Sequence, residues 1–470
     1  MNRILLVRTY RDVGAGGPVA PLGLLCVAAS LRRSLPGGCE IRLLDAGLLR
    51  DPEATVEAVA AAFRPALTGF SALSCEAPLA HRLAAAARRG APSTFIVFGG
   101  PYPTVSPAEA LADPCVDACV AGEGEGAAAE LAAAVLAGRG PAGIPGVAVR
   151  GAELASRPLL EDLDELPRPA WDLADLKAYS GLPNWNGYIK QKIYAPLQTS
   201  RGCPYRCVYC HNLFGKHVRA RRARAVLDEV LLLRDRYGVR EFHVVDDVFN
   251  FDKARLLEFC RLVRTEAPGL AFSFPNGLRA DLFDAESAAA LAGIGTYKIH
   301  FGVESASARI RAAMRKCLSL EEVDRAVRLA GENGITTGGY FMFGFPGETS
   351  AEMRATADYA AASAFDAAYF FRVTAYPGTE LYESLPVGDR PAAGGGFFSP
   401  GAGSVRDAEI RHAILRAQRK FYTPGRLWRL ARKTHNPAGL LRVLPSMAAG
   451  LLLSRLEEEL GRRDGGVSRR

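Results

Sequence analysis

The chain has 470 residues, of which 49% are hydrophobic and 23% charged, and its formal net charge is +8. A chain of this length can bury large cores and is expected to form more than one domain, which excludes a small disulfide-stapled scaffold. No apolar run reaches the length of a membrane span, and Met1 to Arg3 lead into a predicted strand rather than a signal peptide. We therefore expect a cytoplasmic protein without stable membrane insertion.

The first part of the chain, residues 1–142, alternates apolar strands with amphipathic helices, which predicts a doubly wound parallel sheet. A Gly-rich loop over 13–17 follows the first strand, and Pro21 opens a helix that runs to about Leu35. Ligands bind such sheets beyond the carboxyl ends of the strands, where glycine and serine residues gather in this sequence. The expected strands are 3–8, 41–45, 67–71, 95–99 and 116–121.

Residues 143–194 are expected to form an ordered linker, in which 144–150 make one arm of a hairpin. From 195 to 380 the strand–helix alternation returns, and polar or small residues follow several of the strands, as at the active-site end of a barrel. Helices over 407–422, 426–433 and 440–460 make 381–470 a helical C-terminal region. The six expected strands of the second domain are 195–197, 240–245, 271–274, 297–301, 338–343 and 367–373.

Three cysteines follow the first of these strands in one short loop, Cys203, Cys207 and Cys210, spaced C-x3-C-x2-C. Soft thiolates in a compact loop suit an iron–sulfur cluster, and three of them leave one iron of a [4Fe–4S] cube open. A closed zinc site would need a fourth ligand, and His211, directly after Cys210, would strain such a site. Disulfides need pairs and an oxidising compartment, and three unrelated core cysteines are the remaining alternative.

With Tyr209 before its last cysteine, this loop resembles the signature of the radical SAM superfamily. The resemblance implies a partial (β/α)6 barrel of the TIM type and a cluster whose open iron binds S-adenosylmethionine (SAM). In this family, the reduced cluster cleaves SAM to methionine and a 5′-deoxyadenosyl radical. The residues that the resemblance places around SAM are Tyr209, Asp246, Asp247, Asn276, Arg279, Gly302, Glu304, Ser305, Gly344 and Phe345.

Several of these residues have a structural alternative. Glu304, in G-x-E-S, either accepts the ribose hydroxyls of SAM or is an acid at a helix start. Arg279 pairs either with the SAM carboxylate or with Asp281. Asp246 and Asp247 lie either beside SAM or at the cap of the next helix, and the G-F-P-G turn at Gly344 either contacts adenine or only begins a helix.

Four segments of the first domain, PLGL, GFS, GGPYPT and GEGE, together resemble the cobalamin-binding domain of B12-dependent radical SAM enzymes. The D-x-H-x-x-G motif of other cobalamin proteins is absent, and His81 stands in L-x-H-x-x-A. Bound cobalamin would therefore lack a histidine ligand, or the fold could persist without cobalamin. The residues that this resemblance implies for cobalamin are Gly23, Ser71, Gly99, Gly100, Glu123, Gly124 and Glu125.

The leading hypothesis is a radical SAM enzyme that abstracts hydrogen from an unactivated carbon and methylates it with cobalamin, on a specialised metabolite such as an antibiotic precursor. The alternative is radical dehydration, cyclisation or rearrangement of a hydroxylated, sugar-like metabolite without cobalamin. A non-catalytic iron–sulfur sensor is a third hypothesis. The basic charge is expected to lie on solvated faces or to dock a flavodoxin- or ferredoxin-type electron donor, and no nucleic-acid module is found.

Overall fold

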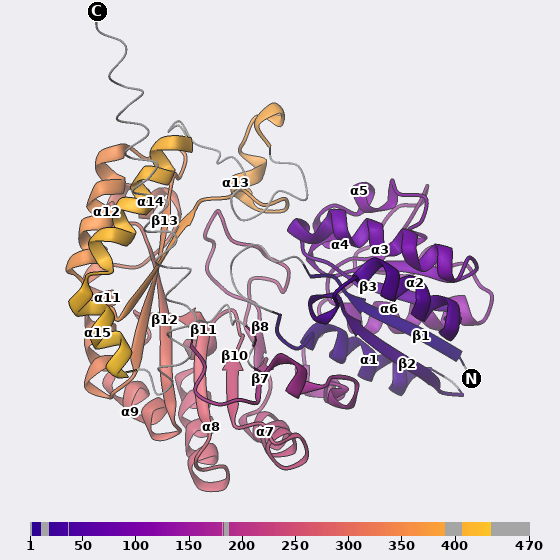
Figure 1. Ribbon diagram of the computed structural model, residues 1–470, viewed down its shortest axis with the longest axis horizontal. Coiled ribbons are helices and arrows are strands. Elements are labelled where there is room, and N and C mark those ends of the chain that lie inside the picture. The colour runs from indigo at the N-terminus through magenta and orange to yellow at the C-terminus, as the bar shows by residue number, and fades with distance from the viewer. Residues whose placement is uncertain are drawn as a thin grey trace, which may run out of the picture.

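The computed structural model describes most of the chain as two α/β units that lie side by side (Figure 1). The Gly-rich loop expected over 13–17 and the helix expected over 440–460 lie outside the described residues. No helix in the described part of the chain is long and apolar enough to cross a bilayer. The described residues are 2–10, 18–35, 37–180, 182, 188–390 and 407–433.

The first sheet has the strand order β2-β1-β3-β4-β5-β6, and only β6 runs antiparallel to its neighbour. The stretch expected as a hairpin arm in the linker contains this edge strand, which follows helix α6 (Gly124–Leu136). The chain turns back directly after it, since the Ala152 amide donates to the Val149 carbonyl at 3.3 Å and the Gly146 amide donates to the Ala155 carbonyl at 2.8 Å. The strands are β1 (Asn2–Arg8), β2 (Cys39–Asp45), β3 (Leu67–Ser71), β4 (Phe95–Gly99), β5 (Ala118–Val120) and β6 (Val147–Val149).

Helices cover both faces of the first sheet, which confirms the doubly wound arrangement. Successive side chains of a strand point to opposite faces, so Leu5 and Val7 pack into one core while Ile4 and Leu6 pack into the other. The first core holds α2 (Pro52–Phe63) and α3 (Ala77–Gly90), and the second holds α1 (Leu22–Ser34) and α6. Two short helices, α4 (Pro101–Val105) and α5 (Pro107–Leu111), follow β4.

The second sheet contains six parallel strands in chain order, from β7 at one edge to β14 at the other. This order is the repeating β/α pattern expected for the barrel, and among the described residues β7 and β14 are not paired with each other. Strands β11 and β12 run past their expected ends at Phe274 and Phe301. The strands are β7 (Tyr194–Leu197), β10 (Glu241–Val244), β11 (Ala271–Leu278), β12 (Thr296–Glu304), β13 (Thr336–Phe343) and β14 (Ala367–Arg372).

The outer face of the second sheet packs against helices, as Figure 1 shows. The opposite face carries an aromatic cluster, in which the His300 ring stacks on Tyr340 with centroids 5.0 Å apart and lies 5.4 Å from the Tyr369 ring. The helices are α7 (Ala223–Tyr237), α8 (Lys253–Glu266), α9 (Ala285–Gly293), α10 (Ala308–Ala313), α11 (Leu320–Glu332), α12 (Ser350–Ala362), α13 (Glu380–Glu383), α14 (Asp407–Phe421) and α15 (Pro424–Lys433).

Buried contacts join the two units. The Trp171 indole in the connector donates to Glu229 of α7 at 3.1 Å, and the Tyr179 hydroxyl donates to Asp45 at the end of β2 at 2.8 Å. On the other side, the loop after β14 approaches the end of α4 so closely that a side chain at Gly378 would lie 2.7 Å from Val105. The carboxyl ends of both sheets therefore face a common junction.

We expect Gly90→Ala to destabilise the protein by about 1–3 kcal/mol, since an added methyl group would collide with the Glu57 carbonyl where α3 crosses α2. Gly331→Ala is the matched control, because Gly331 is also helical and has open space around its Cβ position. Alanine favours the helix there and should leave the unfolding midpoint equal or higher. Thermal denaturation of both variants measures the effect, and equal midpoints would contradict the close helix contact.

Candidate functional site

The loop with the three cysteines is closed at its base by a short antiparallel pair, β8 (Ser200–Arg201) and β9 (Arg219–Ala220). Gly202 begins the loop with φ 89°, and a side chain there would collide with the His217 carbonyl on the returning arm. The Cys203 amide donates to the Gly215 carbonyl at 3.3 Å. Glycine is thus required at 202 both by its backbone angle and by the closeness of the two arms.

Two aspartates after β10 fasten the start of this loop. The buried Asp246 carboxylate accepts from the Thr199 amide at 2.6 Å, the Thr199 hydroxyl at 2.5 Å and the Ser200 hydroxyl at 2.6 Å. Burial raises the pKa of Asp246, although Arg255 and these donors oppose the shift. Asp247 accepts from the Gly202 amide at 3.0 Å. The structure therefore uses both aspartates to hold the loop.

The three sulfurs lie in one neighbourhood. Cys210 is exposed, but partial desolvation of its thiol in the loop, followed by the nearby Cys207 and Cys203 groups, raises its pKa to about 12. Among the described residues, no three ligating side chains converge on a single metal ion. A cubane cluster does not require such convergence, because each thiolate binds a different iron. The donor set is therefore of the kind that a [4Fe–4S] cluster needs.

Glu304 reaches the cysteine loop from the end of β12, where its φ of 68° is unusual for a residue other than glycine. Its buried carboxylate accepts from the Lys316 ammonium at 3.0 Å. A side chain at Gly302 would lie 2.5 Å from the Glu304 carboxylate and 2.9 Å from the Lys316 nitrogen and would displace the ends of these two side chains. Burial and the Glu304 charge both raise the pKa of Tyr209, whose hydroxyl bonds to this carboxylate. Sequence reasoning missed Lys316, because nothing in its local pattern links it to Glu304.

Arg279 and Asn276 lie at the carboxyl end of β11 but serve neighbouring protein groups. The Arg279 guanidinium pairs with Asp281 at 2.8 Å and lies 3.8 Å from the centre of the Tyr205 ring in the cysteine loop. The Asn276 amide donates to the Val245 carbonyl at 2.7 Å and so joins the ends of β11 and β10. The pair of Arg279 with Asp281 is thus present, and its contact with the SAM carboxylate stays a prediction.

The remaining residues expected around SAM are Ser305, Gly344 and Phe345, and each of them contacts neighbouring protein groups. Ser305 is fully buried, and its hydroxyl lies 3.2 Å from that of Thr356. Gly344 has φ 82°, and its amide donates to Glu348 at 2.7 Å. Phe345 packs in a small core with Val208, which stands between two of the loop cysteines. Phe345 thus stabilises the cysteine loop by packing in the same core as Val208.

Ser71, Gly99 and Gly100 come together at the carboxyl ends of β3 and β4. A side chain at Gly100, where φ is 92°, would lie 3.1 Å from the Ser71 hydroxyl. Gly23 on α1 is exposed, with no atom within 4 Å of where its Cβ would be. These small residues leave the strand ends accessible to a bulky ligand.

Both ring nitrogens of His81 contact protein groups, since they lie 2.7 Å from the Asp113 carboxylate and 3.1 Å from the Tyr102 hydroxyl. Gly124 packs against Val27, where a Cβ atom would lie at 3.2 Å.

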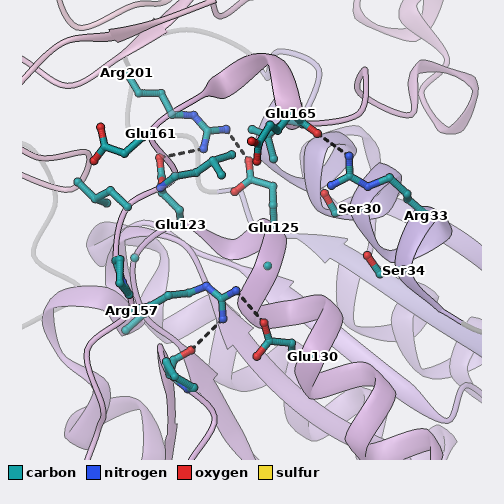
Figure 2. Close-up of a pocket in the computed structure, with 18 residues that line it drawn as sticks. Ser30, Arg33, Ser34, Glu123, Glu125, Glu130, Arg157, Glu161, Glu165 and Arg201 are labelled. Carbon is teal, nitrogen blue, oxygen red and sulfur yellow. Dashed lines mark hydrogen bonds and ion pairs between the residues drawn. The ribbon is translucent and has the colours of Figure 1, made fainter.

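Glu123 and Glu125 pair with arginines of the second domain, as Figure 2 shows for Arg201. These pairs border a cavity of about 550 Å³ between α1, α6 and the connector. The other labelled residues of its wall are Ser30, Arg33, Ser34, Glu130, Arg157, Glu161 and Glu165. The cavity lies beside the two helices, and its wall contains none of the three loop cysteines.

Comparison with protein families gives two matches. The model of the radical SAM superfamily matches residues 197–360, and the model of the B12 binding domain matches residues 13–132. The chain is 33% identical over 383 residues to an uncharacterised methyltransferase of Pyrococcus horikoshii, a match that covers 79% of each chain. It is 29% identical over 417 residues to cytidylyl-2-hydroxyethylphosphonate methyltransferase of Streptomyces wedmorensis, with 77% of each covered.

Two solved structures have a similar fold. The radical SAM methyltransferase TsrM from Kitasatospora setae, with cobalamin and a [4Fe-4S] cluster bound, superposes with a TM-score of 0.66 at 24% identity over 81% of this chain and 74% of TsrM. The cobalamin-dependent SAM radical enzyme OxsB, with aqua-cobalamin and SAM bound, gives 0.72 at 16% identity over 94% of this chain and 72% of OxsB. In both cases the similarity is one of fold.

We expect Gly202→Ala to lower the iron and sulfide content of the anaerobically reconstituted protein, because the two arms of the cysteine loop can no longer approach each other. Gly238→Ala is the control, since Gly238 also has a positive φ of 70° but ends α7, where an added Cβ atom meets only Ile193 at 3.9 Å. Iron analysis and the absorbance of the cluster measure the outcome. Equal iron in the two variants would show that the loop tolerates a side chain at 202.

Glu348 predicts a pH-dependent stability, because burial raises its pKa from 4.5 to about 7. The folded state then binds a proton at Glu348 more tightly than the unfolded state does. The contribution of this proton to the stability of the fold is therefore present below pH 4.5 and is lost as the pH rises through 7. Glu348→Gln keeps an oxygen acceptor but does not titrate. We expect its free energy of unfolding, relative to that of the native protein, to rise by up to about 3 kcal/mol when the pH goes from 5 to 8. Denaturation at both pH values measures this difference, and parallel pH profiles would contradict it.

Proposed function

Because the chain belongs to the family of B12-dependent radical SAM enzymes, we propose that it methylates an unactivated carbon of a small molecule by a radical route. One arrangement carries the proposal: the strand that leads into the cysteine loop pairs, through Arg201, with Glu123 in the domain that matches the B12 binding model. A substrate site at this junction would be open to both domains.

The family brings three groups to such a chain: a [4Fe–4S] cluster, SAM and cobalamin. When bound, they would supply a 5′-deoxyadenosyl radical that takes hydrogen from the substrate and a methyl group that replaces it. Cys203, Cys207 and Cys210 would hold the cluster. The small residues at the ends of β3 and β4 would leave room for cobalamin.

Glu304 would accept hydrogen bonds from the ribose hydroxyls of SAM, and Lys316 would hold its carboxylate in place. The proposal is supported by the position of this pair beside Tyr209 of the cysteine loop. Tyr340 and Phe371, with ring centres 5.8 Å apart on the inner face of the second sheet, would wall the substrate and exclude water. Phe371 is 37% exposed and thus available for contact.

We also propose domain limits of 1–149 for the first unit and 194–380 for the second, with a connector between them and a helical C-terminal region. The first limit moves from 142 to 149 because β6 completes the first sheet. The ten cysteines are free thiols, which supports our proposal of reducing, cytoplasmic surroundings. We also propose a flavodoxin- or ferredoxin-type electron donor, since a radical SAM cluster must be reduced before it acts.

We expect the enzyme, supplied anaerobically with cobalamin, SAM, reductant and candidate metabolites, to form 5′-deoxyadenosine and S-adenosylhomocysteine in equal amounts. Cys207→Ala should abolish both products, since it removes one ligand of the cluster. Cys115→Ala, which changes a partly buried thiol of the first domain, is the control and should leave both products unchanged. Chromatography of the nucleoside products measures them, and deoxyadenosine alone would favour radical dehydration or rearrangement over methylation.

A further inference from the structure

A single carboxylate of the first domain holds both ends of the cysteine loop. Arg201 precedes the loop and Arg219 follows it, and the two residues face each other across the β8–β9 pair. Both guanidinium groups reach the same oxygen of Glu123, Arg201 at 3.0 Å and Arg219 at 2.9 Å. Arg219 also donates to the second Glu123 oxygen at 3.0 Å, and Arg201 pairs with Glu125.

These four side chains form a buried, electrically balanced group. The exposed fractions are 7% for Arg201, 2% for Arg219 and 9% for each glutamate. Burial would raise the pKa of Glu123, but Arg219 and Arg201 outweigh it and hold the pKa below its usual value. Charges in such surroundings remain where their partners fix them, because any displacement leaves a buried charge unpaired.

The connector between the domains is fastened to the same group. The Leu160 amide donates to Glu123 at 3.1 Å, and the Leu160 carbonyl accepts from Arg219 at 2.6 Å. Arg219 additionally donates to the Phe214 carbonyl inside the cysteine loop at 2.9 Å. Three separate segments therefore meet at one point, which lies between the cysteines and the carboxyl end of β5.

We propose that Glu123, Glu125, Arg201 and Arg219 form a positioning cluster that fixes the cysteine loop relative to the carboxyl ends of the first sheet. Glu123 follows Gly122 at the end of β5, and Arg201 stands two positions before Cys203, so the spacing between the domains is set across a few side chains. The inference rests on the proposed function, since its purpose is to hold the radical source and the methyl donor at a fixed separation.

The test uses full-length enzyme, reconstituted with its cluster and cobalamin, in the Glu123→Gln variant. The amide keeps the shape of the side chain but brings N–H groups against the guanidinium groups of Arg201 and Arg219. We expect faster hydrogen exchange in residues 199–221 than in the native enzyme. We also expect the ratio of deoxyadenosine to S-adenosylhomocysteine to rise about tenfold or more, since a misplacement of about 1 Å can cost about 100-fold in rate.

Glu130→Gln is the matched control. Glu130 lies on α6, which begins directly after Glu123, borders the same cavity and pairs with Arg157 of the connector at 2.7 Å. Its carboxylate pairs with Arg157, which lies in the connector and not in the second domain. Its exchange and product ratio should match those of the native enzyme.

Wild-type exchange in residues 199–221 of Glu123→Gln would overturn the proposal, as would an equal rise in Glu130→Gln. If Glu123→Gln does not fold, Arg219→Lys decides instead, because lysine keeps the charge but cannot reach both Glu123 and the Leu160 and Phe214 carbonyls. If the native enzyme forms no S-adenosylhomocysteine, the methylation proposal fails, while the exchange measurement still decides whether these residues position the loop.

Discussion

A short loop that presents three thiols must be held from both ends, because a free loop of this length would sample many conformations and rarely bring its sulfurs together. The fold meets this constraint with partners distant in sequence. Asp246 and Asp247, from the next strand of the sheet, bind the entering arm, and Glu123, from the other domain, binds both arms at their base. The arrangement of the rest of the site follows from this restraint, since Glu304 and Arg279 both reach the loop once it is fixed.

Much of the fold could be predicted from local patterns. The apolar strands of both sheets stand out because buried parallel strands are continuous hydrophobic runs, and the cysteine spacing is a short-range signal. The ends of β11 and β12 were harder to place, since polar residues such as Asn276 and Glu304 continue the strand on the face that points inward. The direction of β6 was not predictable, because a three-residue apolar strand carries no sign of its orientation.

Some of the functional residues can likewise be predicted from local motifs, and others cannot. Local motifs single out the cysteines, Glu304, Glu123 and Glu125, but no motif shows that the carboxylates of Glu123 and Glu125 pair with an arginine more than seventy positions away. Lys316 has no motif and is identified only by its contact with Glu304. Pairing between distant charges depends on the final fold, so spacing along the chain cannot reveal it.

The reversed edge strand β6 has a consequence for the route of the chain. Because β6 runs opposite to its neighbour, the polypeptide leaves the first sheet at the amino ends of the other strands, on the far side from the cysteine loop. It must then travel back along α1 and α6 to begin β7, and on this return path Arg157, Leu160 and Glu165 form the roof of the cavity. The cavity thus forms because the connector passes back over these two helices. Its volume would change with the length of the connector, while both sheets would stay intact.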